Sequence, residues 1–137
     1  MPRFMMPLGT TAAEHDFNAL DDFTRGYIEA LFFTNSGNNE DELNDACFSD
    51  FADETLVAIM KDCDAFQAIN RALLISAVNS FGYGIRCAGN DYWYTRNGHG
   101  TGFWDRDLES IGDALTAACE NRETDAYVGD DGKIYLS

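Results

Sequence analysis

A glycine-rich segment, Gly98-His-Gly-Thr-Gly102, contains the side chain of this chain that is best suited to acid–base chemistry. A histidine between glycines is expected to be exposed, and with Asp105 nearby His99 has the residue types of a general base or a metal ligand. Arg96 and Trp104 flank the segment and would complete a small site. A dinucleotide-binding loop is excluded, because its G-x-G-x-x-G must lead from a strand directly into a helix. The segment therefore predicts, as one alternative, a small enzyme or ligand-binding module that uses Arg96, His99, Trp104 and Asp105.

Acidic residues form the second group of candidate functional residues. The chain of 137 residues has 24 acids against nine bases, which gives a formal net charge of −15. Nine of the acids fall between positions 40 and 64, where Lys61 is the only base. They are Glu40, Asp41, Glu42, Asp45, Asp50, Asp53, Glu54, Asp62 and Asp64. A negative field of this strength repels nucleic acid, which binds to clustered Lys and Arg, and it attracts a basic protein partner.

These nine acids predict a protein-binding surface. Carboxylates on successive helical turns have separations comparable to those of phosphates along a nucleic-acid strand. Such a surface can occupy a nucleic-acid-binding groove and block it. The preferred hypothesis is a non-enzymatic protein that binds a basic, nucleic-acid-binding protein and does not bind nucleic acid itself. The alternative for the acids is that they only keep the chain soluble.

Metal, cofactor and nucleophile patterns are missing from the sequence. The four cysteines, at positions 47, 63, 87 and 119, include no C-x-x-C pair and no histidine at ligand spacing, so we expect no zinc site. Residues 41–45 lack the central glycine and terminal glutamate of a calcium loop. No serine or cysteine lies in a nucleophile-elbow context. We therefore assign no catalytic residue, no metal and no cofactor, and favour a binding protein over an enzyme.

The N-terminal half is predicted to be helical. Apolar residues from Leu20 to Thr34 follow helical spacing, and a longer apolar stripe runs from about Glu54 to Asn79. No run approaches the roughly 18 apolar residues of a membrane span. Residues 1–16 have no signal-peptide pattern, so a cytoplasmic setting with reduced thiols is expected.

The C-terminal half is predicted to contain two hairpins. Residues 91–96 are aromatic and β-branched, and with 101–104 they predict a hairpin around the glycines, in which Tyr92 and Tyr94 face one side and Trp93 the other. A helix follows through residues 108–119, and an Asp-Gly turn then predicts a hairpin over 126–136. The expected fold class is α+β: N-terminal helices, then a β-hairpin–helix–β-hairpin unit forming a small antiparallel sheet, in one domain over residues 1–137.

Two segments carry a resemblance to a known group of proteins. They are Asp91-Tyr-Trp-Tyr-Thr-Arg-Asn-Gly-His-Gly-Thr-Gly-Phe-Trp-Asp-Arg106 and Tyr127-Val-Gly-Asp-Asp-Gly-Lys-Ile-Tyr135, which resemble small acidic proteins encoded by tailed bacteriophages and prophages. The resemblance covers residues 88–137 well and the helical half more loosely. It implies a bacterial host cytoplasm and brings no activity or site residue with it. Restriction or CRISPR-type nucleases of the host are then the expected partners, and a phage structural or assembly component is a further alternative.

Overall fold

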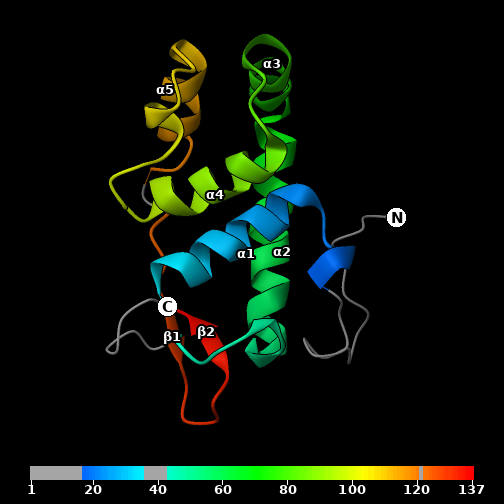
Figure 1. Cartoon of the computed structure of the whole chain (residues 1–137), viewed down its shortest axis with the longest axis vertical. Helices are drawn as coiled ribbons and strands as arrows, with labels where there is room; N and C mark the ends of the chain where they lie inside the picture. The colour runs from blue at the N-terminus through cyan, green and yellow to red at the C-terminus, as the bar shows by residue number, and fades with distance from the viewer. Residues whose placement is uncertain (1–16, 36–42, 121) are drawn as a thin grey trace.

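The structure is a computed structural model that describes residues 17–35, 43–120 and 122–137. The described part contains five α-helices and one two-stranded antiparallel sheet, which confirms the α+β class (Figure 1). The α-helices are α1 (Asp22–Thr34), α2 (Asp53–Ile69), α3 (Arg71–Phe81), α4 (Ile85–Arg96) and α5 (Ser110–Ala117). The 3₁₀ helices are η2 (Phe17–Ala19), η3 (Phe48–Asp50) and η4 (Phe103–Asp105), and the strands are β1 (Ala126–Val128) and β2 (Ile134–Leu136).

Helices α1 and α4 lie side by side across the middle of the molecule (Figure 1). Gly26 of α1 and Gly89 of α4 lie where the two backbones come closest to each other's side-chain positions. A Cβ on either residue would come closer than 3.0 Å to a backbone carbonyl of the other helix. The two backbones can therefore approach only because both residues lack a side chain. Next to Gly89, the Asn90 amide donates a hydrogen bond to the Gly26 carbonyl oxygen at 2.5 Å.

A cluster of buried aromatic rings fills the core between α1, α2 and α4. The Tyr92 ring stacks on Phe66, with the centroids 4.2 Å apart, and lies 5.3 Å from Tyr27 and 5.8 Å from Phe23. Phe103 of η4 stacks on the other side of the cluster, 5.8 Å from Phe66. Helix α4 thus supplies the central ring, and η4 is held against it.

The predicted hairpin over residues 91–104 is wrong. Residues 91–96 end helix α4, and 103–105 form η4. Small and apolar residues at positions 85, 88, 89, 92 and 93 repeat with helical spacing, and they face α1 and the core. Packing this stripe outweighs the low helix propensity of Tyr and Trp, which costs at most about 0.7 kcal/mol per residue. The alternation expected for a strand fails for the same reason, because Tyr92 and Trp93 are both buried.

The long helix predicted from about Glu54 to Asn79 is interrupted. Helix α2 ends at Ile69, Asn70 lies between the two helices, and α3 begins at Arg71. The buried Asn70 side-chain amide donates to the Phe66 carbonyl oxygen at 3.0 Å, a local hydrogen bond that makes asparagine less favourable inside a helix than at its end. The predicted apolar stripe is therefore helical along its length, but it is divided between α2 and α3.

The predicted C-terminal hairpin is confirmed. Strands β1 and β2 pair antiparallel, with Tyr127 opposite Tyr135. Gly132 has φ +80° in the connecting turn, a conformation that favours glycine. The hairpin adjoins the start of α2, where the Ala52 amide donates to the Ile134 carbonyl oxygen at 3.2 Å. Among the residues described, no helix has the length and apolar character to cross a membrane.

Candidate functional site

Carboxylates from three separate segments gather at one end of the molecule. Phe51 forms a parallel bridge with Ile134, and this contact places the hairpin beside η3 and the start of α2 (Figure 1). We define the acidic end as Asp50 of η3, Asp53 and Glu54 of α2, and Asp130 and Asp131 of the hairpin turn. Asp53, Glu54, Asp130 and Asp131 are exposed. The tertiary contact therefore adds two acids, absent from the predicted set, to three that belong to it.

The remaining acids of the predicted set are placed differently. Asp45 is exposed in the turn before η3. The Asp62 carboxylate accepts a hydrogen bond from Arg96 at 3.2 Å, so its charge is compensated. Asp64 lies further along α2 and lines a groove beside α3. Glu40, Asp41 and Glu42 lie outside the described residues.

The charges of the described chain remain strongly unbalanced. Its residues hold 19 acids and eight bases. Eleven acids would thus lack a basic counterpart among the described residues even if every one of those bases formed an ion pair. Four arginines are already committed to ion pairs: Arg25 with Asp22, Arg86 with Glu29, Arg96 with Asp62, and Arg106 with Asp91. The folded surface therefore keeps the negative field that the composition predicts.

The Tyr135 phenol is hydrogen-bonded to an acid of the hairpin turn. The Tyr135 hydroxyl donates a hydrogen bond to Asp131 Oδ2 at 2.6 Å. Because this bond, made to a carboxylate, stabilises the protonated phenol, the pKa of Tyr135 is raised to about 12. The same hydrogen bond lowers the pKa of the Asp131 carboxyl. The pKa of Tyr135 therefore reports the geometry of the turn.

We expect Asp131→Asn to return the pKa of Tyr135 towards the ordinary value of 10.0. The folded-state pKa of Tyr135 is raised, so the stabilisation from this contact is present below pH 10 and is lost as the pH rises through about 12. An NMR titration of ring-labelled tyrosine measures the shift. Asp130→Asn is the matched control and should leave the pKa near 12. An unchanged titration in Asp131→Asn would contradict the turn geometry.

The glycine-rich segment does not assemble a catalytic group around His99. The His99 side chain is exposed, and its ring centroid lies 6.3 Å from those of Trp93 and Tyr94. Among the described residues, it has no hydrogen bond or ion pair with an acid or a nucleophile. Asp105 instead accepts a hydrogen bond from the Thr101 hydroxyl at 3.1 Å, and Trp104 is exposed. The predicted loop residues are close in sequence but face different surroundings.

Arg96 points into the fold and not towards this segment. Its guanidinium donates to the Tyr27 hydroxyl at 3.0 Å and to the Arg122 carbonyl oxygen at 2.6 Å, and it lies 5.2 Å from the centre of the Tyr92 ring. With the ion pair to Asp62, Arg96 connects α4 to α1, α2 and the segment before β1. A structural role for Arg96 follows from these contacts.

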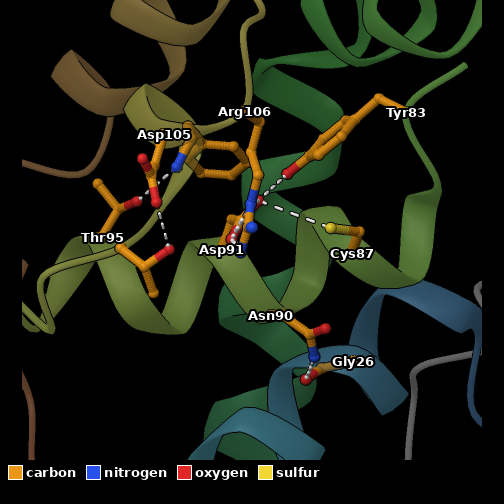
Figure 2. Close-up of polar contacts among 10 residues, drawn as sticks. Gly26, Tyr83, Cys87, Asn90, Asp91, Thr95, Asp105 and Arg106 are labelled. Carbon is orange, nitrogen blue, oxygen red and sulfur yellow. Dashed lines mark hydrogen bonds and ion pairs between the residues drawn. The ribbon is translucent and has the colours of Figure 1, made fainter. Parts of the chain in front are cut away.

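Helix α4 also carries a buried polar cluster, which is centred on Asp91 and is separate from the contacts of Arg96. The Asp91 side chain is 0% exposed, and Arg106 binds both of its oxygens, with Nη2 at 2.8 Å and Nε at 3.0 Å (Figure 2). The Tyr83 hydroxyl donates to the same carboxylate, and the Cys87 thiol lies 3.8 Å from it. Helix α4, the linker that precedes it and the segment after η4 therefore converge on one buried charge.

The electrostatics of this cluster favour a structural role. The hydrogen bonds to Asp91 raise the pKa of the Arg106 guanidinium. Burial raises the pKa of the Tyr83 phenol, and the hydrogen bond to Asp91 raises it further. Burial and the Asp91 charge also raise the pKa of the Cys87 thiol. A thiol that stays protonated is a poor nucleophile. The cluster therefore stabilises the buried Asp91 charge and does not activate Cys87.

Sequence reasoning missed this cluster because residues 91–96 were predicted as a strand. In a helix, Cys87 and Asp91 are four residues apart and share one face. That spacing would have indicated the pair if the helical stripe of α4 had been recognised. No sequence signal points to Arg106 as the partner, because the pairing depends on how η4 folds back over α4.

No group of three or more His, Cys, Asp or Glu side chains that could hold a metal ion occurs among the described residues. The exposed acidic end and a groove beside α3 are the features from which the proposals below are argued. A search of protein-family models, of curated proteins and of solved structures finds no match to this chain.

Proposed function

We propose that this chain is a non-enzymatic binding protein that presents its acidic end to a basic groove on a nucleic-acid-binding protein. The observation that carries the proposal is the convergence of Asp50, Asp53, Glu54, Asp130 and Asp131 through the Phe51–Ile134 bridge. Solubility alone does not require acids from three segments to meet, since scattered charges serve solubility equally well.

Electrostatics would make the interaction fast and specific for a basic groove. A net charge of −15 steers a positively charged partner towards the chain, and the effect weakens as salt rises. The partner's Lys and Arg side chains would bind carboxylates in place of phosphates. Nucleic acid would then be excluded from the groove by both charge and bulk.

The class of partner follows from the charge and from the resemblance to acidic phage proteins. In a bacterial host, the proteins with deep basic grooves include restriction nucleases and CRISPR-type nucleases. We propose these as the first targets to examine, and the host cytoplasm as the place of action. Inhibition would need no chemistry, because occupying the groove is sufficient.

The proposal is tested by a pull-down with two variants of equal charge. One variant neutralises four exposed acids of the acidic end, as Asp53→Asn, Glu54→Gln, Asp130→Asn and Asp131→Asn. The control neutralises four exposed acids elsewhere, as Asp105→Asn, Asp113→Asn, Glu120→Gln and Glu123→Gln. Circular dichroism verifies that both variants fold, because acids in the first turn of α2 contribute roughly 0.3–1 kcal/mol each to the helix.

We expect the tagged wild-type chain to capture a basic nucleic-acid-binding protein from bacterial lysate, and added DNA to displace it. Capture should fall at least tenfold, by about 1.4 kcal/mol or more, for the acidic-end variant and should persist for the control. Equal loss in both variants would mean that only total charge matters. No capture by the wild-type chain at low salt would contradict the proposal.

A further inference from the structure

Helix α3 is the least covered helix of the core. Only Leu74 and Ala77 of its 11 residues are buried. Ile75 is 47% exposed and Phe81 is 41% exposed. Leu73 and Val78 are only partly buried. Ile75, Val78 and Phe81 are spaced three residues apart, so each lies next to the following one on the helix surface. Neighbouring exposed apolar side chains of this kind are typical of an interaction site.

The stretch of sequence that contains α3 also carries few charges. Residues 65–85 contain one charged side chain, Arg71, although 24% of the whole chain is charged. A groove of about 570 Å³ runs beside α3, and Asp64, Arg71, Leu74, Ile75 and Val78 are among the residues that line it. We call these five residues and Phe81 the α3 face. One acid and one base make this face neutral in a chain of charge −15.

We propose that the α3 face is a self-association surface, on which a second copy of this chain packs its own α3 face. Two copies of charge −15 repel each other wherever their acids would meet. A symmetric contact brings the same patch of both copies together, so it is stable only where that patch is apolar and close to neutral. The α3 face meets both conditions, and Arg71 adds a positive charge that attracts the acids of the other copy.

The position of α3 supports a second copy as the occupant. In Figure 1, α3 lies at the opposite end of the molecule from the hairpin and the start of α2. A contact through α3 therefore places the two acidic ends far apart, where their mutual repulsion is smallest. The pair would carry two acidic ends directed away from each other, a bivalent arrangement that strengthens binding to a repeated target. The inference does not depend on the proposed function.

Sedimentation equilibrium of the full chain tests the inference. From about 1 to 500 µM protein, the wild-type mass should rise from 15.2 kDa towards twice that value. Salt provides a second, sharper readout: raising NaCl from about 0.05 to 0.5 M should strengthen the dimer, because salt screens the repulsion between acidic copies. Binding through the acidic end should show the opposite salt dependence, so the two proposals can fail separately.

Variants locate the contact. Ile75→Glu and Phe81→Glu should each raise the dimer dissociation constant at least about tenfold, because a twofold contact contains every substitution twice. Phe33→Glu is the control, since Phe33 is an exposed aromatic on α1 outside the α3 face, and it should leave the dimer unchanged. Ile75→Asn repeats the test if Ile75→Glu lowers the thermal stability. A chain that stays monomeric at every concentration and salt, or a dimer weakened by Phe33→Glu and not by Ile75→Glu, overturns the inference.

Discussion

Gly26→Ala is expected to destabilise the protein by more than about 3 kcal/mol, although it adds only one methyl group. The new Cβ would overlap the backbone carbonyl of Arg86, which cannot move aside as a flexible side chain could. The helices α1 and α4 would have to separate, and the buried contacts of Phe23, Tyr27 and Tyr92 would be lost with them. Alanine's higher helix propensity returns only about 1 kcal/mol.

Thermal denaturation followed by circular dichroism measures this effect. At roughly 4 °C per kcal/mol for a domain of this size, the midpoint should fall by more than about 10 °C. Gly84→Ala is the matched control, because a Cβ at Gly84 meets no atom within 4 Å and its φ of −76° suits any residue. The control should change stability by less than about 1 kcal/mol. Equal midpoints for Gly26→Ala and the wild type would contradict the close approach of the α1 and α4 backbones.

Arg106→Met is expected to cost about 3–5 kcal/mol at neutral pH, the second large effect. The substitution keeps most of the apolar stem and removes the guanidinium that binds both oxygens of Asp91. The carboxylate would remain fully buried, with the Tyr83 hydroxyl and the weak Cys87 thiol as its donors. A buried charge without a counter-charge is far less stable than the same charge in water.

Arg86→Met provides the control, because Arg86 and Arg106 each form a bidentate ion pair with a carboxylate. Arg86 donates to Glu29 at 2.8 and 2.7 Å, but these side chains are 44% and 46% exposed. Solvent screens such a pair, so its loss should cost less than about 1 kcal/mol. Urea denaturation of both variants gives the two free energies of unfolding. Similar losses in both would mean that burial of Asp91 does not control the strength of its ion pair.

A double variant separates the ion pair from the packing around it. Asp91→Leu with Arg106→Met removes both charges and should recover part of the stability lost in Arg106→Met, because no charge is then buried alone. This result would show that most of the loss in Arg106→Met comes from leaving the Asp91 charge buried without its partner, and not from a large net contribution of the ion pair to stability. If the double variant still captures the partner in the pull-down assay, binding through the acidic end does not depend on the Asp91 cluster.

Part of the fold and of the acidic surface could be predicted from local sequence. The apolar spacing of Leu20, Phe23, Tyr27 and Leu31 predicted α1, and all four side chains are buried. The Asp-Gly turn predicted the C-terminal hairpin, because its conformation depends on the residues of the turn alone. The count of acids determined the sign and strength of the field. These features depend on neighbours in the chain, which a sequence displays directly.

The tertiary structure decided the rest, because the responsible contacts join residues far apart in the chain. Residues 91–96 are helical because Gly89 and its neighbours pack against Gly26, more than 60 positions earlier, and local propensity favoured a strand. Arg106 pairs with Asp91 only after η4 folds back over α4. Asp130 and Asp131 join Asp53 and Glu54 only through the Phe51–Ile134 bridge. Composition alone determined that this protein is acidic, and long-range packing determined which acids lie together and which helix face stays uncovered.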